Sequence, residues 1–362
     1  MRRVGSRLAV LGLALFMTTA IAGEARAAEP TEHEQYLVEL LNRARLDPQS
    51  EVVRLGTGDL NEGPPTLGGN AYVIQDGPHQ PVAINPLIVD AARDYAELQN
   101  DNDELCHTCL GSWPESRMTA AGYVPMLSYF DFFDIAGYTL LYGTASPVQF
   151  VPGRENLAFR GEGPSNGVID DLTGAADLVH EGLFNDFATP SRGHRSTLLY
   201  GEWKEIGVGI SQGTDPGPLD SMYVGFDFAH RSDTGPFITG VAFDDLDSDG
   251  FYTPGAGEAL GGLLVEAHVA GGGSLADSTT TFASGGYSLD VPVGSYDVTF
   301  TGPGISETVL GVGVAAGPEG IPENTKVDLV LLPEPSRFLL LTSGLAGLAL
   351  LRLVQTWKRR PR

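Results

Sequence analysis

Apolar positions recur mainly at helical spacing in the first part of the chain and alternate as in strands further on. Residues 206–210 and 222–228 alternate apolar residues with glycine or polar ones, which predicts two strands. Segment 124–152 is rich in aromatic residues and shows no single period. Residues 31–230 therefore mix helices and strands, an α+β arrangement. Spacing and cap residues predict helices that begin near Thr31, Asn85, Pro114 and Asp170.

The helical period disappears after residue 236. Short alternating runs are then separated by Gly, Pro and Asp turns, which is typical of a small all-β sandwich over residues 237–332. Residues 231–236 are the expected linker. The runs are 264–270, 279–283, 287–291, 296–301, 308–314 and 326–331.

Residues 1–27 have the pattern of a secretory signal peptide. Three arginines precede an apolar run over 8–22, and small residues surround Ala27, where we expect cleavage. The alternative is a retained membrane anchor, which the shortness of the apolar run disfavours. We therefore expect an exported protein.

Residues 333–362 begin with Pro333-Glu334-Pro335, continue without a charge over 338–351, and end in a basic cluster. A helix over 337–357 is long enough to cross a bilayer if Arg352 reaches the interface, and the basic end predicts a cytoplasmic C-terminus. The arrangement resembles the PEP-CTERM sorting signal of bacterial proteins. The resemblance implies transient contact with the inner membrane, cleavage by an exosortase-type enzyme, and a final place in the cell envelope or outside the cell. The alternative is a simple C-terminal anchor.

Charge narrows the choice of partners. The whole chain has 22 basic and 46 acidic residues. Without residues 1–27 and 333–362, 12 basic and 44 acidic residues remain, a net charge of −32. Such a body repels nucleic-acid phosphates and favours divalent cations, so we expect no nucleic-acid partner. Two cysteines do not make a disulfide scaffold.

Four residues of the first domain are candidates for a polar site: His107, Glu155, Glu181 and His194. Two imidazoles and two carboxylates can hold a zinc-like divalent metal, with a carboxylate orienting an imidazole or acting as base. The residues are spread over about 90 positions and form no spacing motif by themselves. Each also has a structural alternative as a surface, capping or loop-stabilising residue.

The order of several segments over residues 31–230 resembles the CAP superfamily of secreted proteins. The most specific are Glu155-Asn156-Leu157-Ala158 and Gly193-His194-Arg195, which precede a glycine-punctuated strand. The resemblance implies a three-layer α-β-α sandwich with a cleft lined by a His/Glu tetrad, here His107, Glu155, Glu181 and His194. The tryptophan that normally precedes the second glutamate is absent, so His180 competes with Glu181 for the fourth place. The two histidines are the expected ligands of a divalent metal.

Cys106 and Cys109 flank His107 and allow three interpretations. A local disulfide that holds the loop presenting His107 is favoured in an exported chain. A thioredoxin-like redox pair needs a strand before it, whereas a helix precedes this pair. A zinc site with both thiolates and a histidine is the third alternative.

The second domain has a candidate calcium loop. Asp245, Asp247 and Asp249 alternate before Gly250, with Glu258 further on, but the spacing to Glu258 and the lack of flanking helices exclude an EF-hand. The segment resembles the calcium-binding B-type modules of bacterial surface adhesins, whose prealbumin-like sandwich the rest of the domain fits. The alternative is a solvated acidic turn.

Three functions follow as hypotheses. The first is an envelope module whose cleft binds a metal and an unidentified peptide, lipid or glycan, with the sandwich as a calcium-set spacer. The second is a structural matrix protein that contacts envelope or extracellular matrix components. The third is a metal-dependent hydrolase that uses the same tetrad. A fold does not decide between them, and the first is favoured.

Overall fold

The computed structural model describes eight stretches of the chain, and the signal-peptide and sorting-tail predictions lie outside them, as does nearly all of 124–152. None of the described helices is both long and apolar enough to cross a membrane. The described stretches are 28–62, 73–124, 155–163, 166–187, 192–214, 219–231, 233–317 and 320–332.

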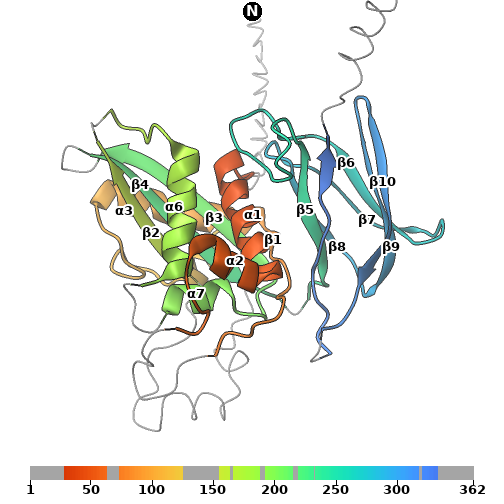
Figure 1. The fold of residues 1–362 in the computed structure, drawn as a ribbon, viewed down its shortest axis with the longest axis horizontal. Coiled ribbons are helices and arrows are strands. Elements are labelled where there is room, and N and C mark those ends of the chain that lie inside the picture. The colour runs from red at the N-terminus through yellow and green to blue at the C-terminus, as the bar shows by residue number, and fades with distance from the viewer. Residues whose placement is uncertain are drawn as a thin grey trace, which may run out of the picture.

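The first half of the chain is built on a four-stranded sheet with the order β1-β3-β4-β2 (Figure 1). The β1–β3 pair is parallel and the other pairs are antiparallel. Strand β2 lies at one edge of the sheet. The strands are β1 (Ala83–Ile84), β2 (Glu155–Glu162), β3 (Glu205–Thr214) and β4 (Asp220–Ala229).

The helices begin where the sequence offers caps. Thr31 and Glu34 form the predicted capping box of α1, and Asn85 caps α3 ahead of its first-turn proline. Asp47 ends α1 and also caps a further helix, α2, which spacing alone did not predict. The bounds are α1 (Glu32–Leu46), α2 (Pro48–Leu55), α3 (Pro86–Asn102), α4 (Pro114–Ala120), α6 (Leu172–Asn185) and α7 (Gly193–Leu198).

Alternate residues of β3 face different helices. Ile206 and Val208 enter a core shared with α1 and α6. Gly207 and Gly209 face α3, and a Cβ at Gly207 would lie 2.1 Å from the carbonyl carbon of Ile88. The sheet is therefore a middle layer, with α3 packed closely on one face and α1 and α6 on the other.

The second half is all β. One sheet has the order β10-β9-β6-β7, and in the other β5 pairs with β11, β12 and β8. Apolar side chains from both sheets form one core. The mixture of helices and strands predicted for the chain is confirmed. The strands are β5 (Phe237–Asp244), β6 (Leu264–Val269), β7 (Leu275–Thr280), β8 (Gly286–Asp290), β9 (Gly294–Gly302), β10 (Ile305–Val314), β11 (Thr325–Lys326) and β12 (Leu329–Leu331).

The two halves share a tightly bonded junction. Asn324 donates its amide to the carbonyl oxygens of Pro81 at 2.9 Å and Lys204 at 2.7 Å. Lys326 forms an ion pair of 2.7 Å with Glu39, which is buried in α1. Residues 231–236 therefore join bodies that also hold one another through side chains far away in the sequence.

Candidate functional site

The loop that presents His107 lies between α3 and α4 and is fixed at several points. Cys106 and Cys109 are joined in a disulfide. Tyr95 donates its hydroxyl to the Cys106 carbonyl at 2.6 Å, and Gln99 donates to the same oxygen at 3.0 Å. This carbonyl is therefore held by α3 independently of the disulfide.

His107 contacts a buried carboxylate. Its Nδ1 lies 2.7 Å from Oε2 of Glu155, the first residue of β2. The other oxygen of Glu155 accepts from Arg117, which also donates to the carbonyls of His107 at 3.1 Å and Ser112 at 2.7 Å. The His107 side chain is 54% exposed and that of Glu155 only 2%. Arg117 thus ties the carboxylate and the histidine loop together.

His194 repeats this geometry with a different acid. Its Nδ1 lies 2.8 Å from Oδ1 of Asp186, and its backbone N–H donates to the other oxygen at 2.9 Å. The ring is 33% exposed and Asp186 is 2% exposed. Asn156, which follows Glu155 in β2, donates to the His194 carbonyl at 3.0 Å. Each histidine and its buried acid form one histidine unit, His107 with Glu155 and His194 with Asp186. Two consecutive residues of the edge strand, Glu155 and Asn156, therefore take part in or contact these two units.

The carboxylate beside the Nδ1 of each histidine fixes the tautomer of both rings. A carboxylate can only accept a hydrogen bond, so the Nδ1 of each histidine carries a proton. In a neutral ring the lone pair is then on Nε2, which can accept from a ligand or bind a metal. The two partly exposed rings are thus oriented in the same chemical sense.

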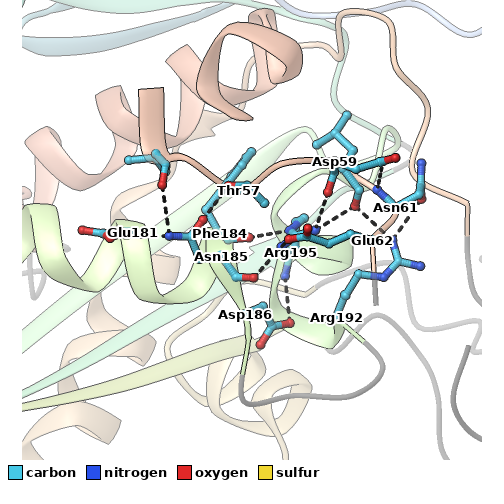
Figure 2. Close-up of polar contacts among 12 residues, drawn as sticks. Thr57, Asp59, Asn61, Glu62, Glu181, Phe184, Asn185, Asp186, Arg192 and Arg195 are labelled. Carbon is cyan, nitrogen blue, oxygen red and sulfur yellow. Dashed lines mark hydrogen bonds and ion pairs between the residues drawn. The ribbon is translucent and has the colours of Figure 1, made fainter. Parts of the chain in front are cut away.

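The start of α7, which carries His194, is anchored by buried arginines (Figure 2). Arg195 donates to the carbonyls of Asn185 and Leu60, and its guanidinium lies 3.6 Å from Glu62. Arg192 also donates to the Leu60 carbonyl, at 3.0 Å. Because these bonds go to backbone oxygens, Arg195 holds the loop after α2 against the start of α7. Its role is therefore structural.

The structure does not bring Glu181 to either histidine. Glu181 is exposed on α6 and accepts only a long contact of 3.5 Å from Asn185 among its described polar contacts. His180, one position earlier, faces inward and contacts Glu51 on α2 at 2.8 Å. Successive helix positions point about 100° apart, so the buried stripe includes His180 and leaves Glu181 in solvent. Neither residue contacts His107 or His194 among its described polar contacts.

Two acids of the site were not predicted from the sequence. Asp186 takes the place of a glutamate as the partner of His194, and Asp227 lies beside Glu155 in the sheet. Asp227 is 1% exposed, and neither of its carboxylate oxygens has a described hydrogen-bond partner. The available signal was a polar residue at an inward position of an otherwise apolar strand, Phe226-Asp227-Phe228.

The predicted calcium loop brings three of its four acids together. Asp245, Asp247 and Glu258 each offer an oxygen within 4.8 Å of the others. Asp245 and Glu258 are buried, with 1% and 0% exposure. Asp249 lies outside this group, and its carboxylate accepts the Phe251 N–H at 2.7 Å in a local turn contact.

The described residues do not close a metal site around the histidines. Within those residues, the groups of three or more potential ligands are the calcium-loop acids and Glu104 with the two disulfide-bonded cysteines. Neither His107 nor His194 belongs to one. The histidines therefore present two separate nitrogen atoms and no assembled tetrad.

Comparison with known proteins gives little further constraint. No family model matches the chain, and no curated protein matches its sequence. Among similar solved structures are an outer surface protein from Borrelia burgdorferi (15% identity, TM-score 0.22, 41% of this chain and 78% of that one) and the CAP domain of enterococcal PrgA (16%, 0.31, 56% and 64%). BmVAL-1 is another (11%, 0.30, 57% and 81%). All three TM-scores are below 0.5, so the fold rests on strand order and layers and not on these likenesses.

Proposed function

We propose that residues 28–230 form an exported CAP-type binding domain and that His107 and His194 are its ligand-contacting residues. The order of the Glu-Asn-Leu-Ala and Gly-His-Arg segments supports the family, together with helices on both faces of one sheet. The ligand is a peptide, lipid or glycan of the cell envelope.

The observation that carries the proposal is the paired geometry of the histidines. Each Nδ1 is held by a buried carboxylate, at 2.7 Å and 2.8 Å, and each ring is partly exposed. Imidazoles held in this way are pre-oriented for metal ions or hydrogen-bond donors, because the carboxylate behind each ring fixes its orientation.

Binding is favoured over hydrolysis. Catalytic zinc centres use three protein ligands around one ion and keep a position open for water. Within the described residues, no group of three ligands includes either histidine. The oriented nitrogens suit recognition without that assembly.

We assign the second domain the role of a calcium-set spacer. Two of its three convergent acids are buried, and calcium prefers several carboxylate oxygens. The aromatic ring of Phe251 in the same loop packs against Tyr36 of α1, with ring centres 6.0 Å apart. A filled loop would thus stiffen the attachment of the two halves. The signal peptide and sorting tail would carry this body to the envelope through exosortase-type processing.

The test uses zinc as a probe of the two lone pairs. Calorimetry on the full chain should show zinc binding that falls at least tenfold in His194→Ala, because the nitrogen ligand is lost. Asp186→Asn should weaken binding by about 10–100-fold, the usual loss for an outer carboxylate. The control is His268→Ala, since His268 is a similarly half-exposed histidine in the second domain. Zinc binding that is unchanged in His194→Ala would remove this centre from the proposal.

A further inference from the structure

Asp227 is an acidic residue at a buried position inside the four-stranded sheet. It lies in β4 directly opposite Glu155 of β2 and Gly207 of β3. Residues opposite one another in antiparallel strands point to the same face, so Asp227 and Glu155 are side-chain neighbours. The Asp227 side chain is buried, and both of its oxygens lack a hydrogen-bond partner within the described part of the chain.

The neighbouring groups leave Asp227 without a counter-charge of its own. The described charges that act on it are Glu155 on β2 and Glu115 and Arg117 on α4. Arg117 is the positive one, and its terminal nitrogens donate to Glu155 and to the backbone of the His107 loop. From β3 the facing residue is a glycine, behind which the α3 backbone packs.

An ionised carboxyl in this place would be costly. Burying an unpaired charge costs far more than burying a neutral acid, so such a group keeps its proton. Burial raises the pKa of Asp227 well above its ordinary value, and the charge of Glu155 raises it further while Arg117 opposes both. Glu155, in contrast, uses both oxygens as acceptors for Arg117 and His107.

We propose that Asp227 is held as a neutral carboxylic acid beside Glu155, with which it forms a dyad of neighbouring side chains on one face of the sheet. Asp227 is assigned a positioning role, because its side chain neighbours Glu155, which contacts His107. A neutral Asp227 adds no negative charge to the Arg117–Glu155 ion pair beside it. The inference deepens the proposed function and rests on it in one respect: with Asp227 neutral, the centre carries no second carboxylate charge, so the ligand can meet it with hydroxyl or amide hydrogen-bond donors.

The experiment compares the folding stability of Asp227→Asn with that of the unchanged chain by urea unfolding between pH 4 and pH 8. Asparagine has the size of the neutral acid and cannot ionise. In the unfolded chain the aspartate ionises above about pH 4, while the folded chain keeps the proton. The folding constant of the unchanged chain should therefore fall by up to about tenfold per pH unit relative to the variant.

The expected result is that the variant becomes the more stable protein toward pH 8 and that the two curves converge near pH 4. The control is Asp94→Asn, which removes an exposed charge from α3 and should show no such pH-dependent gap. A variant that is less stable than the unchanged chain by the same amount at every pH would overturn the proposal, since Asp227 would then be an ionised, structurally paired group.

A second measurement tests the proposal even if the Asp227→Asn variant does not fold. Carbon-13 NMR of the unchanged chain, labelled at its aspartate carboxyl carbons, should show a protonated carboxyl at pH 7. Its absence would overturn the proposal. Both measurements are made without ligand or zinc, so a failure of zinc binding would refute the proposed function and leave the dyad standing.

Discussion

At the scale of single residues, the room available for a side chain constrains the packing as much as charge does. Gly207 and Gly209 lie under α3, where a Cβ at either position would fall about 2.1–2.2 Å from helix backbone atoms, closer than the contact distance between carbon atoms. The helix can approach the sheet this closely only because side chains are missing there. The same approach seals Asp227 from water on its β3 side.

Gly207→Ala should therefore destabilise the fold by about 2–3 kcal/mol, the upper part of the range for overpacking, since backbone and not a flexible side chain must move. Urea unfolding measures this loss. The control is Gly225→Ala, because Gly225 faces the same helix with its nearest atom at 3.5 Å. Equal losses for the two variants would contradict the close approach.

The sequence identified the members of the two histidine units unevenly. His107, Glu155 and His194 stand in ordered segments that resemble a family, so they could be named. The partner of His194 could not be named, because Asp186 follows the last residue of α6 in a left-handed conformation, with φ of 50°. The end of a helix is poorly fixed by periodicity, and the family resemblance offered Glu181, with His180 as its competitor, as the fourth residue of the site and named no partner for His194.

At the scale of elements, Glu51 connects three helices. From α2 it accepts from Arg43 of α1 at 2.8 Å and contacts His180 of α6 at 2.8 Å. Burial alone would raise the pKa of Glu51, but hydrogen bonds from His180 and Arg43 outweigh it and lower the pKa to about 2. The ionised form is thus bound more strongly in the folded chain than in the unfolded one.

Glu51→Gln should cost about 3 kcal/mol near pH 7, because the folded-state pKa of about 2 lies well below the ordinary value of 4.5. Because the folded pKa is depressed, the stabilisation is complete above the unfolded value near 4.5 and disappears as the pH falls toward 2. Chemical denaturation across this window is the measurement. A loss that stays constant down to pH 2 would show that Glu51 acts through its shape and not its charge.

Elements with a local start signal were predictable. The caps of α1 and α3 are encoded within a few residues, and both helices begin where expected. The edge strand β2 was missed because its burial does not alternate: its first three residues are buried and most of the rest are half-buried. Strand β5 was missed because it is buried almost throughout and shows no alternation. Tertiary surroundings, which sequence spacing does not contain, define both strands.

At the scale of the whole molecule, the calcium loop and α1 form one contact zone. The guanidinium of Arg43 lies 4.9 Å from the ring centre of Phe251, and the Gly255 N–H donates to Glu32 at 2.6 Å. Val241 and Phe243 of β5 belong to the same apolar core as α1. A change in this loop therefore reaches both halves.

Calcium at about 100 times its dissociation constant should stabilise the chain by about 2.7 kcal/mol and raise a single thermal transition shared by both halves. Scanning calorimetry with and without calcium measures this. Glu258→Gln should abolish the gain, whereas Asp249→Asn, in the same loop but outside the convergent group, should largely keep it. Separate transitions, of which calcium moves only one, would contradict the shared zone.

The position of β12 has a mechanical consequence. Leu331 pairs beside Asp244 in a parallel ladder, and its carbonyl accepts the Asp245 N–H at 2.8 Å. A pull on the chain beyond residue 332 would enter through β12 and load its hydrogen bonds with β5 along the strand axis, so that several bonds share the strain. The first backbone bond beyond that ladder belongs to a calcium-loop acid. Tension from an envelope attachment would therefore be felt at the ion-binding loop before it reached the first half of the chain, which contains the histidines.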